Sequence, residues 1–312
     1  MKKKIISVVT PCYNEEANVE AIYQQVKEVV SVFKNLSYEH IFIDNDSTDL
    51  TQNLLRTLAA RDPKVKVIIN ARNFGHIRSP YHALKAAQGD AVISIVADLQ
   101  DPPQLIKEFI LKWQEGYDVV IGIKEQSQES AILFAIRKLY YNLINRLSET
   151  ELVKNFTGFG LYDKKVINVL RTIDDPYPYF RGLISEIGYK QYRIPYIQPS
   201  RKRGITKNNF YTLYDMAMLG ITSHSKIPLR LATFLGFITS FISFFIATGY
   251  LIYKLIFWNS FSLGTAPMII GVFFFASVQL FFTGIIGEYI GGVYTQVLKR
   301  PLVIEKERIN FK

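Results

Sequence analysis

Residues 91–103 read AVISIVADLQDPP, an apolar run that ends in acidic and amide side chains followed by two prolines. The β-branched first half predicts a buried strand, and the prolines predict a turn that starts the next helix. The oxygen atoms of Asp98 and Gln100, at the end of such a strand, are ligands of the kind that Mg²⁺ or Mn²⁺ prefers. A strand followed by a simply capped helix explains this segment equally well when it is taken alone.

The same arrangement of a strand followed by a polar cluster occurs upstream. Apolar runs at 5–9, 40–43 and 64–70 predict strands, and the periodicity of 19–33 predicts a helix. Strands that alternate with helices predict an α/β domain with a largely parallel sheet, and ligands bind beyond the carboxyl ends of such strands. The first two runs lead into polar clusters that would lie at this edge, Thr10-Pro-Cys-Tyr-Asn-Glu15 and Asp44-Asn-Asp-Ser-Thr-Asp49.

Two segments near the C-terminus, 231–253 and 267–287, contain no charged residue. Each is long enough to supply the ~20 apolar residues that cross a bilayer. Both are rich in Phe, Ile and Gly, which fits lipid better than the alternative of a buried hairpin in a soluble protein. We therefore expect two transmembrane helices.

Basic residues flank these segments on one side of the membrane. Lys226 and Arg230 precede the first span and Lys299 and Arg300 follow the second, whereas the loop between the spans carries only Lys254. Because basic flanks stay in the cytoplasm, the chain is expected to be a multi-pass protein of the inner or plasma membrane, with its large N-terminal domain and both termini cytoplasmic.

Composition supports this placement. The single cysteine excludes an intrachain disulfide and agrees with a reducing compartment. The net charge of +10 could suggest nucleic acid, but a cytosolic domain docked on anionic lipid is also basic. Given the two spans, we expect a membrane surface as the partner and no nucleic acid.

A basic loop and an amphipathic segment connect the domain to the spans. Residues 201–207 read RKRGITK, and 208–224 are amphipathic at helical spacing, which predicts an interfacial helix. The chain thus divides into a cytosolic catalytic domain at 1–207, an interfacial region at 208–228, the two spans within 229–298 and a cytosolic tail at 299–312.

The motifs resemble those of glycosyltransferase family 2, and within it the polyprenyl-phosphate glycosyltransferases. The resemblance covers essentially the whole chain and rests on the two polar clusters above, on Asn73-Phe-Gly-His76 and on the Ala-Asp-Leu-Gln-Asp-Pro-Pro segment, in this order and spacing. That group includes dolichyl-phosphate mannose synthases and bactoprenol glucosyltransferases, and the C-terminal pair of spans favours the second. The resemblance implies a GT-A (Rossmann-like) domain that binds a nucleotide sugar.

The resemblance also implies roles for residues of the nucleotide-sugar site. Pro11, Tyr13 and Glu15 would line the uracil and ribose pocket, and Asp44 would accept hydrogen bonds from the base or ribose. Asp46 either orients that loop or caps the following helix.

Asp98 and Gln100 match the family's metal and diphosphate site, but two positions depart from the family pattern. Val96 stands where relatives carry an acid, so the nucleotide phosphates and water are expected to complete the metal's shell. Asn155 stands where relatives usually carry an Asp near the sugar and acceptor. This Asn is either a natural departure or an alteration of the chain. Asp101 either belongs to the site or only caps the helix after the prolines.

The basic loop resembles the family's Arg-x-x-Gly-x-Ser-Lys segment. Arg201 and Lys207 are suited to phosphate oxygens, because guanidinium and ammonium groups stabilise concentrated negative charge. We assign them to the acceptor phosphate, with the donor diphosphate as the other possible role. A solvated basic loop near anionic headgroups is the alternative. Together with Asp98 and Asn155, these two residues form the predicted catalytic set.

The sequence therefore predicts an inverting, metal-dependent glycosyltransferase that moves glucose from UDP-glucose to a polyprenyl (undecaprenyl-type) phosphate. The alternatives are GDP-mannose as donor, another lipid acceptor, a processive synthase, or an inactive membrane-anchored protein that only binds a nucleotide sugar. Two spans give little surface for gripping a long lipid. Small residues that permit close helix packing predict a homo-oligomer, a tetramer or dimer: Gly284, Gly287, Gly291 and Gly292.

Overall fold

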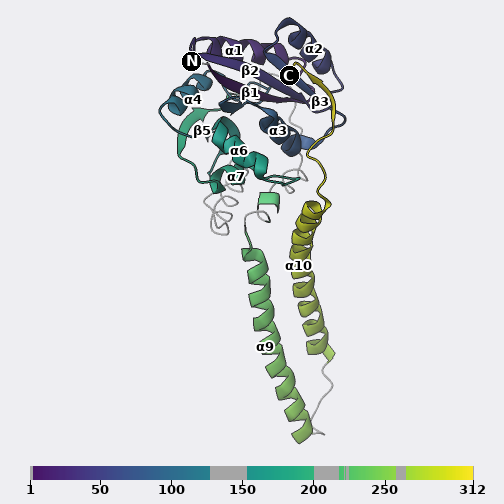
Figure 1. Ribbon diagram of the computed structural model, residues 1–312. Helices are drawn as coiled ribbons and strands as arrows, with labels where there is room; N and C mark the ends of the chain where they lie inside the picture. Colours follow the sequence, from purple (N-terminus) through teal and green to yellow (C-terminus); the bar gives the residue numbers. More distant parts are fainter. Residues whose placement is uncertain are drawn as a thin grey trace.

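The computed structural model describes residues 3–126, 153–199, 218–220, 222, 225–257 and 265–311. Arg201, Lys207 and most of the predicted interfacial helix lie outside the described residues, so their proposed roles stay predictions. The described chain forms an α/β domain from which two long helices project (Figure 1).

An eight-stranded sheet forms the centre of the domain, with the order β7-β5-β6-β4-β1-β2-β3-β8. The strands β4, β1, β2 and β3 pair in parallel, whereas β6 is antiparallel to β4 and β5, and β8 is antiparallel to β3. Their bounds are β1 (Lys4–Cys12), β2 (Leu36–Asp44), β3 (Val65–Asn70), β4 (Ala91–Ser94), β5 (Val119–Gln126), β6 (Phe156–Asp163), β7 (Gln191–Ile197) and β8 (Glu305–Ile309). The predicted parallel sheet is confirmed at its first four strands.

Helices cover both faces of this sheet because its central strands are apolar on both sides. One core cluster joins Val8 and Phe42 to the helices α1 (Val19–Ser31), α2 (Thr51–Arg61) and α4 (Leu105–Gln114). The other joins Val9 and Ile43 to α3 (Gly75–Ala86), α6 (Lys164–Thr172) and α7 (Phe180–Glu186). Strands buried on both faces read as continuous apolar runs, which explains why 91–95 shows no polar alternation.

The order of the strands reverses between β1 and β4. From β1 the chain moves outward to β2 and β3, and it then crosses back to place β4 on the other side of β1. Such a reversal opens a crevice beyond the carboxyl ends of the two strands, because the loops that follow them diverge to opposite faces. This feature positions the candidate site.

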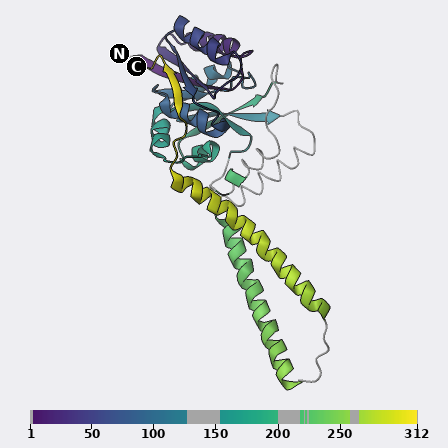
Figure 2. The same cartoon turned by 90° about the vertical axis from the view of Figure 1, so that its right-hand side faces the viewer.

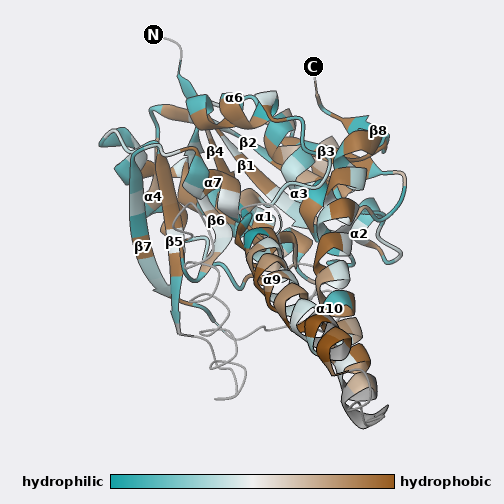
Figure 3. Ribbon diagram, turned by 90° about the horizontal axis from the view of Figure 1, so that it is seen from below, coloured by the Kyte–Doolittle hydropathy of each residue, from teal (hydrophilic) through white to brown (hydrophobic). Residues whose placement is uncertain are grey.

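The two projecting helices are α9 (Ile227–Ile256) and α10 (Thr265–Leu298). Both contain stretches long and apolar enough to cross a membrane, Ile227–Ile246 and Gly271–Leu298, and none of the side chains in the most apolar window of each is buried. Figure 2 shows them as a hairpin that stands away from the domain, and the colouring of Figure 3 shows that many of their residues are hydrophobic. The second helix continues to Leu298, eleven residues beyond the span predicted to end at Gly287.

The end of the chain returns to the catalytic domain. The strand β8 pairs with β3, Ala71 N–H donates to the Ile304 carbonyl (2.8 Å), and Arg56 forms an ion pair with Glu307 (2.7 Å). We had expected only a cytosolic tail at 299–312. The structure adds that Glu305–Ile309 of this segment completes the sheet.

His40 is a buried titratable group in β2. Its ring stacks on Phe42 with ring centroids 4.0 Å apart, its Nε2 lies 2.9 Å from Thr10 Oγ1, and its Nδ1 has no hydrogen-bond partner among the described residues. Burial lowers the pKa of His40 to about 3, with Asp62 opposing the shift. The folded protein therefore holds this ring neutral.

We predict that His40→Gln makes folding stability less sensitive to acid. Between about pH 6.5 and 3 the unfolded chain binds a proton on His40 that the folded chain rejects, so this residue lowers stability by roughly 1.4 kcal/mol per pH unit as the pH falls. Glutamine keeps a polar side chain but does not titrate. Denaturant unfolding in detergent from pH 7 to 5 measures the slope, and equal slopes for the two proteins would contradict the prediction.

Candidate active site

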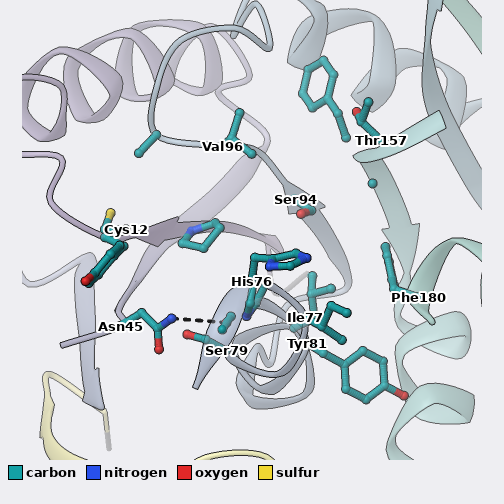
Figure 4. Close-up of a pocket in the computed structure, with 18 of the residues that line it drawn as sticks. Cys12, Asn45, His76, Ile77, Ser79, Tyr81, Ser94, Val96, Thr157 and Phe180 are labelled. Carbon is teal, nitrogen blue, oxygen red and sulfur yellow. Dashed lines mark hydrogen bonds between the residues drawn. The ribbon is translucent and has the colours of Figure 1, made fainter. Parts of the chain in front are cut away.

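A cavity of about 570 Å³ lies beyond the carboxyl ends of β1 and β4. Figure 4 shows Cys12 and Asn45 on one side, Ser94 and Val96 behind, and Thr157 and Phe180 on the other side. The polar and charged lining residues are Tyr13, Glu15, Asn45, Asn73, His76, Ser79, Tyr81, Ser94, Asp98, Asp101, Thr157, Tyr179 and Arg181.

The predicted uracil and ribose residues Pro11, Tyr13 and Glu15 line this cavity. They lie in the loop after β1, which is held by the loop after β2. Asn14 N–H donates to Ser47 Oγ (2.9 Å), and Glu15 N–H donates to Thr51 Oγ1 (2.8 Å). These hydrogen bonds fix the loop of the first motif relative to the loop of the second.

Asp44 lies buried at the end of β2 and does not line the cavity. Its Oδ2 accepts hydrogen bonds from Ser47 N–H (2.9 Å) and Gln52 Nε2 (2.9 Å), whereas its Oδ1 has no partner among the described residues. Burial raises the pKa of this carboxyl above its ordinary value, although the hydrogen bonds oppose the shift. Because this unpartnered oxygen is buried as well, the predicted contact of Asp44 with the base or ribose stays a prediction.

Asp46 is half-buried, has a positive φ of 64° and does not line the cavity. The carboxylate that accepts a hydrogen bond at the start of α2 is that of Asp49 rather than that of Asp46. Asp49 Oδ1 accepts from Thr51 N–H (3.0 Å). Asp and Asn tolerate the left-handed conformation better than most residues. Asp46 therefore fits the remaining alternative, in which it shapes the loop.

Asn45 connects the loop after β2 with the loop before α3. Its Nδ2 donates to Asn73 Oδ1 (2.8 Å) and to the Gly75 carbonyl (3.2 Å). Its Oδ1 accepts from Phe74 N–H (2.9 Å) and from Asn70 Nδ2 (3.0 Å). One amide thus fixes the Asn73–His76 motif, so that His76 lies at the cavity (Figure 4).

The loop after β4 carries the two carboxylates of the 91–103 segment. Asp98 is half-buried and its Oδ1 accepts from Gln100 N–H (3.2 Å), while Leu99 between them has a φ of 58°. Val96, at the position where the family usually has an acid, is 38% exposed and lines the cavity. This wall therefore has an apolar surface beside Asp98.

Asp101 is 3% exposed and accepts a hydrogen bond from the Tyr196 hydroxyl (2.8 Å). Burial raises its pKa to about 6; the bond from Tyr196 opposes the shift, and the charge of Asp98 adds to it. The helix after the prolines begins at Leu105 without a side-chain cap. Of the two alternatives for Asp101, the structure supports membership of the site rather than capping.

The predicted metal ligands are only partly brought together. Asp98 lines the cavity, whereas Gln100 does not. Among the described residues, no group of three or more His, Cys, Asp or Glu side chains could hold a metal ion. Asp98 with Asp101 beside it still fits Mg²⁺ or Mn²⁺ of the kind that takes few protein carboxylates and fills its shell with substrate phosphates and water.

The opposite wall consists of Thr157, Gly158 and Phe159 from β6, together with the segment 178–181 at the start of α7. The β6 residues follow Asn155, in the segment that the family resemblance places near the sugar and acceptor. No motif marks 178–181; only the aromatic and proline content of DDPYPYFRG at 174–182 draws attention to it. Asn155 lies just before β6, with a φ of 59°, but does not line the cavity.

Comparison with known proteins identifies the family. Residues 7–171 match the family described as Glycosyl transferase family 2. A protein of Synechocystis sp. named an uncharacterized glycosyltransferase is 36% identical over 96% of this chain and 94% of its own length. A prophage-derived bactoprenol glucosyl transferase of Shigella flexneri is 33% identical over 97% of both chains. A prophage bactoprenol glucosyl transferase homolog of Escherichia coli is 32% identical over 96% of this chain and 98% of its own.

Among solved structures, a mannosyltransferase from Pyrobaculum calidifontis has 16% identity and a TM-score of 0.46, over 96% of this chain and 87% of that one. The matches over nearly the full length confirm the expected GT-A fold and glycosyltransferase activity. The chain belongs to glycosyltransferase family 2.

Proposed function

We propose that this glycosyltransferase transfers glucose from UDP-glucose to the phosphate of a polyprenyl lipid at the cytoplasmic face of the membrane. The observation that carries the proposal is a nucleotide-sized cavity in a domain that bears two membrane-length helices. Its volume of about 570 Å³ lies within the usual range for small-molecule sites. Relatives that align over nearly all of the chain are named bactoprenol glucosyl transferases, which supports glucose and a polyprenyl phosphate as substrates.

The donor's nucleotide would occupy the side of the cavity formed by the loops after β1 and β2. Tyr13 provides a flat apolar surface with a polar edge, and Glu15 provides a carboxylate in the same wall of the cavity. Asp98, at the end of β4, would hold a divalent cation together with the diphosphate. When bound, such a cation stabilises the negative charge of the departing diphosphate.

The reaction is a single displacement. An oxygen of the lipid phosphate attacks the anomeric carbon of glucose, the bond from that carbon to the β-phosphate oxygen breaks, and UDP leaves with the electron pair. The configuration is inverted. A phosphate monoester has a second pKa of about 6, so the attacking oxygen is already ionised at neutral pH and needs no general base. An amide at position 155 is therefore compatible with the chemistry.

Membrane placement follows from the basic flanks. The basic residues lie at two different helix ends: Lys226 and Arg230 at the start of α9, and Lys299 and Arg300 just after the end of α10. Both of these ends are on the side of the catalytic domain (Figure 1). The positive-inside rule then assigns the domain and both termini to the cytoplasm. The cavity would face the leaflet in which the polyprenyl phosphate presents its headgroup.

A test of the function uses purified protein with labelled nucleotide sugars, a polyprenyl phosphate and Mg²⁺ or Mn²⁺. We expect label from UDP-glucose, rather than from GDP-mannose, to enter the lipid fraction. Asp98→Ala should abolish transfer and metal-dependent UDP binding, because few protein ligands remain to the cation. Metal-dependent UDP binding without any lipid product would instead indicate an inactive binding protein.

Asn155→Asp should raise transfer if the amide replaces a functional carboxylate. The substitution keeps the size of the side chain and is compatible with the positive φ of this position. The measurement is the rate of glucose transfer by the variant and by the parent protein, both at saturating UDP-glucose. Unchanged or lower turnover would mean that the mechanism of this protein uses Asn155 as it stands.

We further propose that the protein is a homo-oligomer whose spans pack between protomers. Added Cβ atoms at Gly284, Gly287 and Gly291 would meet nothing within 4 Å, so this small-residue face is open in the single chain. Because native Cys12 is buried, Gly287→Cys with a thiol cross-linker should give dimers in native membranes, whereas Val293→Cys, which is exposed on the opposite side of the same helix, provides a matched control that should not cross-link. Monomers only, with a monomeric mass in mild detergent, would refute this proposal.

A further inference from the structure

We propose that Arg181 binds the acceptor's phosphate, as a site residue additional to the basic loop at 201–207. This inference rests on the proposed function, because it assigns the acceptor subsite of the same cavity. It starts from the charge of the lining. Among the described residues that line the cavity, Arg181 is the sole Lys or Arg, and it shares the cavity with Glu15, Asp98 and Asp101.

Among the described residues, the guanidinium of Arg181 makes one weak contact, a long hydrogen bond of 3.5 Å from Nη1 to the Phe156 carbonyl. No carboxylate of the described chain forms an ion pair with it. A half-buried arginine at a cavity, with no ion-pair partner among the described residues, is suited to a phosphate, because its fork of N–H donors matches two phosphate oxygens at once.

The backbone that carries Arg181 is held in place. The neighbouring Phe180 ring packs against Tyr162 and Tyr81, with ring centroids 5.2 Å and 6.3 Å apart. Arg78 Nε donates to the Pro176 carbonyl (3.1 Å), which ties the segment before α7 to α3. Packing of its neighbours therefore fixes the point from which the Arg181 side chain starts.

The position of this wall favours the acceptor over the donor. The nucleotide loops after β1 and β2 form the other side of the cavity, whereas α7 lies at the end of the domain from which α9 and α10 project (Figures 1 and 3). Gln296 of α10 donates to Asp175 Oδ1 (2.7 Å), so the segment leading to Arg181 touches the helix that continues into the membrane. A lipid phosphate entering from the bilayer would reach this wall first.

The decisive experiment measures binding of each substrate by the full-length protein in detergent. For Arg181→Ala, we expect the affinity for a short polyprenyl phosphate, such as farnesyl phosphate, to fall roughly 10- to 100-fold, the loss typical of a charge-assisted contact. Arg181→Lys should restore part of this affinity. Binding of UDP-glucose with Mn²⁺, and of the uncharged farnesol, should stay as in the parent.

Arg193→Ala is the matched control, because Arg193 is exposed on β7 and does not line the cavity. A comparable loss of UDP-glucose affinity in Arg181→Ala would move the residue to the donor diphosphate, and an equal loss for farnesol would reduce it to a structural role. Unchanged affinity for farnesyl phosphate would also overturn the inference.

Failure of the proposed function would look different. If the parent protein binds farnesyl phosphate through Arg181 yet transfers no glucose, the acceptor subsite stands and the proposed reaction is wrong. If the parent transfers glucose and Arg181→Ala does so with an unchanged KM for the lipid phosphate, only the role of Arg181 is wrong. A parent protein that binds no farnesyl phosphate overturns both.

Discussion

Pairing of β1 with β4 is the constraint on which the site depends. Val9 lies opposite Ser94 in this parallel ladder, and on the other side of β1 Cys12 lies opposite Asp44. Three strands therefore end at one edge, and each releases a polar loop there. Because a one-residue slip in register would turn every side chain to the opposite face, the apolar cores on both sides fix the positions of the catalytic loops.

The loops themselves are held by hydrogen bonds to one another rather than by regular structure. Asn14, Asp46, Leu99 and Asn155 all have positive φ, a conformation that L-residues adopt at a cost. Each of them lies in or beside a motif loop at the cavity. Backbone strain that is concentrated in this way persists only where the surroundings enforce it. Here the enforcing groups include the side chains of Ser47 and Asn45, which are themselves parts of the second motif, and that of Thr51 at the start of α2.

The strands and the motif residues could be predicted, because short stretches of sequence determine them. The strands at 5–9, 40–43 and 64–70 were placed within a few residues, because two buried faces demand continuous apolar runs. The first motif residues were likewise recognised, and Pro11, Tyr13, Glu15 and Asp98 do line one cavity. The α/β class and the family followed from the order of these motifs.

Features that depend on distant partners could not be predicted. Asp101 is drawn into the site by Tyr196, 95 residues later, and nothing in the segment ADLQDPP distinguishes that burial from a helix cap. The wall with Arg181 comes to the cavity because β6 lies antiparallel beside β4, a pairing that no short pattern announces. The strand β8 reads as a charged tail, since an edge strand exposes alternate polar side chains.

That last strand changes the mechanical relation between the domain and the bilayer. The sheet has β7 at one edge and β8 at the other, and the two apolar helices lie between these strands in the chain. On its C-terminal side the membrane hairpin is joined to the domain by the short described segment 299–304, between the end of α10 and the start of β8. Because β8 is part of the sheet, this connection limits how far the domain can swing relative to α10, and it ties the height of the cavity above the lipid headgroups to the fold itself.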